Sequence, residues 1–338
     1  MQTLLVFGAT GTGKTVIAGE FALYQAFKHN APCLYCGADS GWDSAGDKVA
    51  MGVMEPYNLA SHPNALWALR RIARGMWPRE IDPNGRAVNP SDFVDIRQHP
   101  KLAKTGISGL IIEGLSRNAE LMSTQLVNDM EGIKTGEPLV SQFRIDGKGK
   151  TTTPQGDKNV FLSQELEDEE MFALPSRGTY NFLQSQTSAY VNAMKGHPHA
   201  PRILFTAHQT EGKSSEGPGR VLGPLIFGRA GVDRAPGWFG SYFHAQTFPR
   251  DSFGQGSPEV KALWYEWHAD QSLGLPWPSK FGVPANVITQ FRREFPYGFV
   301  PSWINPDGSM VGGISVILRA LDNGAAPPPA ITNGLRLI

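Results

Sequence analysis

Short apolar runs alternate with amphipathic stretches along much of this chain. Stretches whose apolar residues recur near a 3.6-residue period predict helices, at residues 15–29, 65–75 and 180–195. Continuous apolar runs predict buried strands, at residues 4–7, 33–37, 109–114 and 202–207. Buried strands that alternate with helices are typical of a mainly parallel sheet with helices on both faces. We therefore expect an α/β fold.

Other segments depart from this alternation. Residues 133–170 and 210–223 are polar and rich in Gly, Ser or Thr, which predicts mobile surface insertions. We expect residues 1–295 to form one core with these insertions, and residues 296–338 to form a C-terminal extension and tail. The proline-rich tail is interpreted either as an extended arm or as a frayed terminus.

Composition limits the possible environment and partners. The 338 residues include 31 basic and 31 acidic side chains, so the chain as a whole does not attract polyanions. No run approaches the roughly 18 apolar residues that a membrane span needs, and no export leader is expected. The two cysteines, Cys33 and Cys36, lie in a predicted strand, and we interpret them as core residues in a reducing cytoplasm.

A phosphate-binding motif follows the first predicted strand and opens the first predicted helix. It matches G-x-x-x-x-G-K-[ST] at every fixed position. Its glycines allow successive backbone N–H groups to point inward as an anion site, its lysine binds β- and γ-phosphates, and the following hydroxyl ligates Mg²⁺. No guanine-reading N-K-x-D segment is present, which favours ATP. The predicted ATP and Mg²⁺ site comprises Gly8, Ala9, Thr10, Gly11, Thr12, Gly13, Lys14 and Thr15.

Polar residues at the ends of three other strands are candidates for catalysis beside Lys14. Glu113 ends the third strand, where its carboxylate either reaches Mg²⁺ or acts on the attacking water. Asp39 follows the second strand, and His208 follows the fourth, where it can sense the γ-phosphate. Each also has a structural interpretation: a polar strand end, a turn former and a hydrogen-bonding side chain, respectively. We expect all three strands to neighbour the first strand.

These blocks together resemble the RecA-like P-loop ATPases. The resemblance is carried by residues 33–40, 110–113 and 204–208, spans residues 1–295, and extends to small phage-encoded RecA-core ATPases, some of which assist single-strand annealing. It implies a RecA-like core, ATPase activity and, for a phage-encoded protein, the cytoplasm of a bacterial host. By this resemblance, Asp39 stands where the family usually has a catalytic Glu, His208 where it has a sensing Gln, and Glu113 where it usually has Asp.

The resemblance also implies partners. RecA-like proteins form rings or filaments whose loops after the acidic and sensor strands hold DNA, so we expect a homo-oligomer that binds single-stranded DNA. The basic residues in the corresponding segments here are Lys148, Lys150, Lys213 and Arg220. Arg229 and Lys280 are candidates for a cation supplied to a neighbouring subunit. The alternative is that these segments are solvated loops without a ligand.

Three functions remain open from the sequence. The first is an ATPase that acts on single-stranded DNA in phage-type recombination or replication. The second is an assembly or packaging ATPase that acts on protein partners, and the third is a nucleotide-dependent switch with little turnover. A fold alone does not choose among them.

Overall fold

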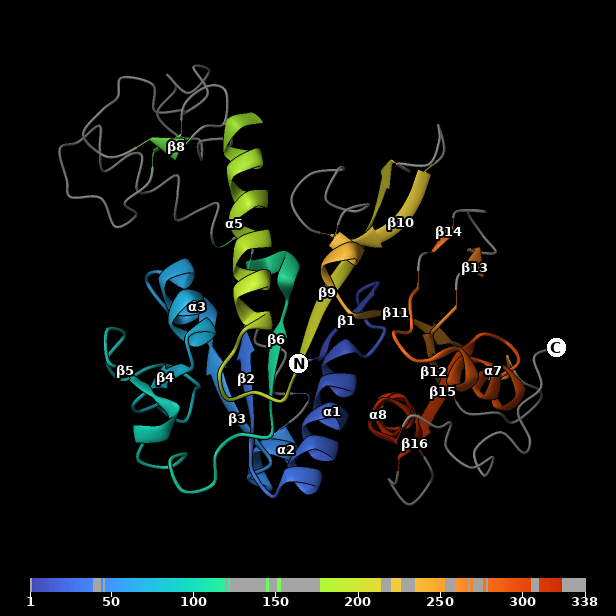
Figure 1. Cartoon of the computed structure of the whole chain (residues 1–338), viewed down its shortest axis with the longest axis horizontal. Coiled ribbons are helices and arrows are strands. Elements are labelled where there is room, and N and C mark those ends of the chain that lie inside the picture. The colour runs from blue at the N-terminus through green and yellow to red at the C-terminus, as the bar shows by residue number, and fades with distance from the viewer. Residues whose placement is uncertain are drawn as a thin grey trace.

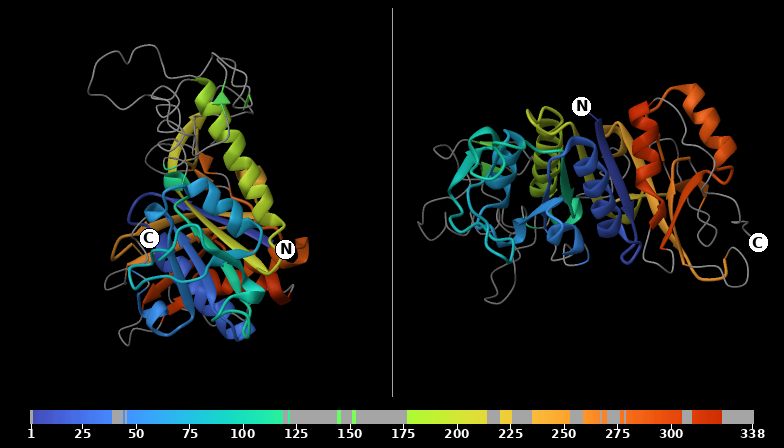
Figure 2. Two further views of the ribbon diagram at one scale, coloured as in Figure 1. Left: turned by 90° about the vertical axis from the view of Figure 1, so that its left-hand side faces the viewer. Right: turned by 90° about the horizontal axis from the view of Figure 1, so that it is seen from below.

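One large mixed sheet organises the chain. The computed structural model describes residues 2–38, 44, 46–118, 121, 144–145, 151–152, 177–213, 220–225, 235–252, 259–266, 268–269, 276–277, 279–304 and 310–323. Strands of the main sheet run in the order β16-β15-β12-β11-β1-β9-β6-β2-β3, and β10 pairs with β9 outside this path. The sheet confirms the α/β class, and Figure 2 shows its N-terminal and C-terminal parts at opposite ends.

The N-terminal part of the sheet is parallel. Its pairs are β3/β2, β2/β6, β6/β9, β9/β1 and β1/β11. The expected strands are present as β1 (Gln2–Gly8), β2 (Cys33–Gly37), β6 (Gly109–Glu113) and β9 (Arg202–Lys213), joined by β3 (Met54–Asn58) and β11 (Ser241–Phe248). Parallel strands buried on both faces need apolar residues at successive positions, and β1, β2 and β6 have them.

Helices cover both faces of the parallel strands, as predicted. Alternate residues of β1 point to opposite sides: Leu5 and Phe7 pack with α3 (Ala65–Ala73) and α5 (Arg177–Lys195). Leu4 and Val6 pack with α1 (Lys14–His29), α7 (Ala285–Glu294) and α8 (Ile314–Asn323). Figure 1 shows α1 beside α8 and α5 rising past the end of the sheet.

The C-terminal part of the sheet is antiparallel and includes elements on both sides of the domain boundary expected at residue 295. β12 (Val260–Trp264) pairs with β11 and with β15 (Phe299–Ile304), which pairs with β16 (Met310–Gly312). β15 and α8 contribute Val300 and Ile317 to the core beside α1. β15, β16 and α8, which lie beyond the boundary expected at residue 295, therefore extend the sheet and cover its helical face.

Two local expectations were wrong. β6 and β2 do not neighbour β1, because β9 lies between β1 and β6. Residues 210–213 and 220–223 are not loop: β9 continues to Lys213 and pairs with β10 (Arg220–Pro224) in an antiparallel hairpin. Glycine and serine indicate a turn, but strand pairing continues on either side of it.

The remaining strands and short helices lie outside the main sheet. Residues 76–78 form a strand of a small separate sheet. The smaller strands are β4 (Met76–Pro78) with β5 (Phe93–Asp95), β7 (Arg144–Ile145) with β8 (Thr151–Thr152), and β13 (His268–Ala269) with β14 (Pro276–Trp277). The short helices are α2 (Gly46–Ala50), η2 (Leu59–Ser61), η3 (Ile96–Gln98) and η4 (Ala235–Trp238). None of the helices in the described ranges combines the length and apolar character that crossing a membrane requires.

A polar cluster ties α8 to α1 and to the sheet. Asp322, near the end of α8, accepts hydrogen bonds from Tyr24 Oη at 2.8 Å and Arg202 Nη2 at 2.9 Å, and pairs with Lys28 Nζ at 2.7 Å. Burial alone raises the pKa of Asp322, but the hydrogen bonds from Lys28 and Tyr24 and the charge of Arg202 hold it below its ordinary value. The ionised carboxylate therefore stabilises the fold.

We predict that Asp322→Asn lowers the free energy of unfolding by about 1–3 kcal/mol at neutral pH, because the nearly buried Arg202 guanidinium loses its countercharge. A carboxyl whose pKa is depressed by folding stabilises the protein above its unfolded pKa and loses that contribution as the pH falls. The variant should consequently show a flatter loss of stability in acid. Urea unfolding across a pH series measures both effects.

Asp92→Asn is the matched control, because Asp92 pairs with Arg79 at an exposed site. An exposed ion pair contributes about 0–1 kcal/mol, so this control should unfold nearly as the wild type does. Equal stability of Asp322→Asn and the wild type at every pH would contradict the assigned role of Asp322.

Candidate functional site

The motif at residues 8–15 forms the connection between β1 and α1. Gly13 precedes the first residue of α1 with φ 79°, and Gly11 has φ 83°, both in the left-handed region that favours glycine. A Cβ on Gly8 would lie 2.4 Å from the carbonyl oxygen of Ala245, so the neighbouring strand β11 also requires glycine there. Thr12 Oγ1 donates to the Ala9 carbonyl at 2.9 Å and closes the loop. The loop therefore leads into the N-terminus of α1, and a helix N-terminus favours anions.

Lys14 is folded back over this loop. Its Nζ donates to the carbonyl oxygens of Gly8 at 3.1 Å and Ala9 at 2.7 Å, and the residue is only 9% exposed. Desolvation of a buried lysine head group is costly, and anionic groups offset that cost. Backbone carbonyls offer weaker compensation than phosphate oxygens do. The ammonium is thus held in place for an anion at the loop.

Glu113 reaches the same loop from the end of β6. Thr15 Oγ1 donates to Glu113 Oε1 at 2.5 Å, across 98 residues of sequence. The carboxylate is 5% exposed, and its Oε2 accepts no hydrogen bond from the described residues. Burial raises the pKa of Glu113 above its ordinary value, against the opposing effects of the Thr15 hydrogen bond and the Lys14 charge. An unpartnered buried carboxylate oxygen beside a hydroxyl is a donor set that Mg²⁺ accepts.

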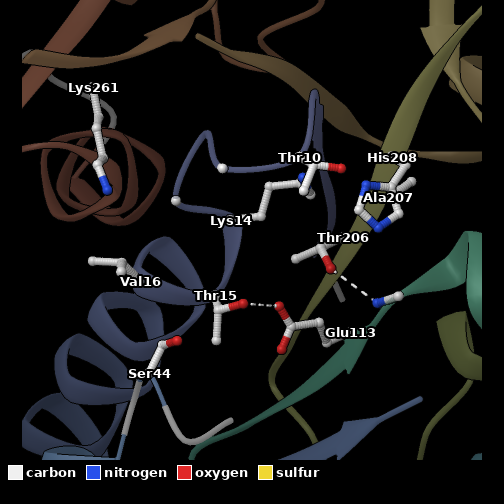
Figure 3. Close-up of a pocket in the computed structure, with 13 residues that line it drawn as sticks. Thr10, Lys14, Thr15, Val16, Ser44, Glu113, Thr206, Ala207, His208 and Lys261 are labelled. Carbon is white, nitrogen blue, oxygen red and sulfur yellow. Dashed lines mark hydrogen bonds between the residues drawn. The ribbon is translucent and has the colours of Figure 1, made fainter. Parts of the chain in front are cut away.

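A cavity of about 370 Å³ joins these groups (Figure 3). This volume lies within the usual range for small-ligand sites, roughly 300–1,000 Å³. Figure 3 shows Thr15 and Glu113 facing each other across its floor, with Thr206 beside them. The lining residues come from the loop, the start of α1, the segment before α2, the end of β6, β9 and β12: Thr10, Gly11, Gly13, Lys14, Thr15, Val16, Ser44, Glu113, Gly114, Thr206, Ala207, His208 and Lys261.

The sensor candidate His208 lines the cavity where β9 leaves the parallel sheet. Its backbone N–H donates to Ser116 Oγ at 3.0 Å, and its carbonyl accepts from the Leu225 N–H at 2.6 Å. Ser116 Oγ in turn donates to the Leu225 carbonyl at 2.7 Å. The next residue, Gln209, is 3.2 Å from the buried His244 ring through Oε1 and Nε2. These bonds connect the segment after Glu113 with the β9–β10 hairpin.

The structure brings together some of the predicted site residues and not others. The loop, Glu113 and His208 share one cavity. Lys213 and Arg220 are opposite one another in the hairpin register. Lys280 is exposed, pairs through its backbone with Tyr242 and does not line the cavity. The other candidates lie outside the described residues: Asp39, Lys148, Lys150 and Arg229.

Two lining residues escaped the sequence reasoning. Thr206 Oγ1 accepts the Gly114 N–H at 3.0 Å and so fixes the end of β6 against β9. A polar residue just before the predicted end of an apolar strand was the available signal. Lys261 enters from β12, far along the chain. No local pattern marks it, because its position depends on antiparallel pairing with β11.

We predict that the free energy of unfolding of Glu113→Gln at neutral pH equals that of the wild type or exceeds it by up to about 2 kcal/mol. The reason is that the buried site of the variant holds no ionised carboxylate. A carboxyl whose pKa is raised by folding costs no stability below its ordinary pKa, and the cost grows as the pH rises through the raised value. The advantage of the variant should therefore appear above the ordinary glutamate pKa. Urea unfolding at several pH values measures it.

Glu80→Gln, at an exposed position, should leave stability unchanged throughout this pH range. A clear loss of stability in Glu113→Gln alone would mean that the Glu113 carboxylate is a structural group rather than one held for a ligand.

No family model matches this chain, and no curated protein matches it. Solved structures with a similar arrangement include a KaiC-like protein from Pyrococcus horikoshii, at 11% identity over 92% of this chain and 89% of that chain, with a TM-score of 0.35. They also include the flagellar accessory protein FlaH from Methanocaldococcus jannaschii, at 7% identity over 92% and 88%, also with a TM-score of 0.35. At these values the likeness carries no argument about what this chain does.

Proposed function

We propose that this protein binds ATP with Mg²⁺ at the loop of residues 8–15 and hydrolyses it. The observation that carries the proposal is the hydrogen bond between Thr15 and Glu113 at the base of a cavity lined by Lys14. A complete phosphate-binding motif, a buried lysine whose Nζ donates to two carbonyl oxygens of the loop, and a buried carboxylate meet there. A nucleotide with its cation would fill the cavity and contact all three.

The donor set suits Mg²⁺. This ion is usually held by one or two carboxylates together with substrate phosphates. Thr15 Oγ1 and Glu113 would hold it, with Glu113 Oε2 the oxygen that has no other described partner. When bound, Mg²⁺ neutralises charge on the phosphates.

The chain's own residues divide the work. Lys14 and the backbone N–H groups at the start of α1 bind and orient the phosphates. As the alternative to holding Mg²⁺, Glu113, whose pKa is raised by burial, would orient the attacking water and accept its proton. His208, on the wall formed by β9, is placed to respond to the terminal phosphate, and its backbone bonds pass any shift to Ser116 and Leu225.

The test separates binding from hydrolysis. Lys14→Ala should lower ATP affinity on the order of 100-fold, because a charge-assisted phosphate contact is lost. Glu113→Gln should keep ATP affinity but slow hydrolysis by about two orders of magnitude or more. Calorimetric titration with ATP and a phosphate-release assay, both with Mg²⁺, measure the two effects.

Lys101→Ala and Glu80→Gln remove or neutralise exposed side chains of the same types and should behave as the wild type. The ATPase proposal fails if the wild type binds no ATP, or if Lys14→Ala binds and hydrolyses it normally. Normal turnover by Glu113→Gln would assign the water-orienting role to Asp39.

We further propose single-stranded DNA as the partner, acted on by a ring or filament. The supporting observation is the hairpin β9–β10, in which Lys213 and Arg220 are register partners. The hairpin continues directly from the strand that carries His208, and hydrogen bonds join its base to the segment after Glu113. Nucleotide at the site would therefore reposition two basic residues together. Backbone phosphates of a single strand are the natural ligand for such residues.

The double variant Lys213→Ala/Arg220→Ala should weaken binding of an oligothymidylate and reduce the slope of log affinity against log salt, by about 0.7 for each lost phosphate contact. Fluorescence titrations at several salt concentrations measure both. Lys101→Ala/Lys104→Ala, which removes the same charge from an exposed segment, should not change the slope. Wild-type ATPase activity without any DNA binding would favour a protein-directed assembly ATPase, and nucleotide binding without turnover would favour a switch.

A further inference from the structure

The side chain of Lys261 lies against the phosphate-binding loop. Lys261 is paired with Thr247 of β11 in the antiparallel part of the sheet. A Cβ placed on Gly13 would lie 2.6 Å from Lys261 Nζ and 2.8 Å from its Cδ. Because Gly13 has no side chain, the Lys261 ammonium can occupy the space beside it. Figure 3 shows Lys261 on one side of the loop and Glu113 on the other.

Among the described residues, Lys261 has no ion-pair partner. Within the described part of the chain, no carboxylate comes within ion-pair distance, 4.0 Å, of its Nζ. Glu20 of α1, which is 7% exposed, is an acidic group whose pKa the charge of Lys261 lowers. Burial raises the pKa of Glu20 to about 8, against the charges of Lys48 and Lys261 and the Ile314 amide. At neutral pH Glu20 is therefore largely protonated and provides little countercharge.

Packing alone does not explain this arrangement. Lysines that cover apolar surface usually bury their carbon stem and extend the ammonium into water. Here the nitrogen is the atom nearest to the space beside Gly13, and the half-buried residue lines the same cavity as Lys14 and Thr15. Two ammonium groups and a helix N-terminus consequently converge on one cavity. Such a site favours ligands with several negative charges.

We propose that Lys261 is a second phosphate-binding lysine, which contacts the phosphates of a nucleoside di- or triphosphate from the side of the loop opposite Glu113. This inference rests on the proposed function and deepens it. It gives the site a cation from its own chain, contributed by the antiparallel part of the sheet. Loss of Lys261 should therefore weaken nucleotide binding.

The test compares Lys261→Ala, Lys261→Arg and the exposed-lysine control Lys101→Ala. Calorimetric titrations with ATP and with ADP, both with Mg²⁺, should show about a tenfold loss of affinity for each nucleotide in Lys261→Ala, as expected for one charge-assisted contact at a half-exposed site. Lys261→Arg should stay within about threefold of the wild type because it keeps the charge. The affinity of Lys261→Ala for nucleotide should also depend less on salt than that of the wild type.

Unchanged ATP and ADP affinity in Lys261→Ala, with binding lost in Lys14→Ala, would overturn the role of Lys261 and leave the proposed function intact. A lower melting temperature of nucleotide-free Lys261→Ala, together with no recovery of affinity in Lys261→Arg, would assign the lysine to packing and overturn the inference as well. Absence of saturable nucleotide binding in the wild type would instead overturn the proposed function, and the inference with it.

Discussion

The hydrogen bond from Thr15 to Glu113 is the contact on which the candidate site depends. It joins the start of α1, which follows β1, to the end of β6. The strands β1 and β6 are not neighbours in the sheet. β9 makes the contact possible, because its register with both β1 and β6 aligns their carboxyl ends along one edge of the sheet. Thr206 then holds the Gly114 amide, so the carboxylate of Glu113 is fixed in a buried position facing the loop. The parallel pairing of β1, β9 and β6 thus places the oxygens of Thr15 and Glu113 beside each other.

The same edge connects the site to the rest of the molecule in two directions. Through Ser116 and Leu225 it reaches the β9–β10 hairpin, and through Gly13 and Lys261 it reaches the antiparallel strands. Helix α1 begins in the loop and packs against α8, whose Asp322 holds Lys28, Tyr24 and Arg202. A ligand at the loop therefore contacts a rigid frame rather than an isolated turn, which is the arrangement that a functional site requires.

Much of the site could be predicted from the sequence because its signals are local. The loop pattern fixes eight consecutive residues, and an apolar run that ends in a carboxylate identifies Glu113. The order of the strands could not be predicted, because the sequences of residues 109–113 and 202–207 do not indicate which strand lies beside β1. Lys261 was missed for the same reason, since long-range pairing with β11 brings it to the loop. The hairpin at Lys213 and Arg220 was mistaken for a loop because Gly and Ser are frequent in this segment, and no alternation of apolar and polar residues marks the paired strands.

A crystal structure with a non-hydrolysable ATP analogue and Mg²⁺ would test the central claim most directly. Lys14 Nζ now donates to the carbonyl oxygens of Gly8 and Ala9. With ligand bound, it should leave these carbonyls for phosphate oxygens, and the Thr15–Glu113 hydrogen bond should give way to an ion between the two side chains. A nucleotide bound elsewhere, with Lys14 and the Thr15–Glu113 contact unchanged, would contradict the account.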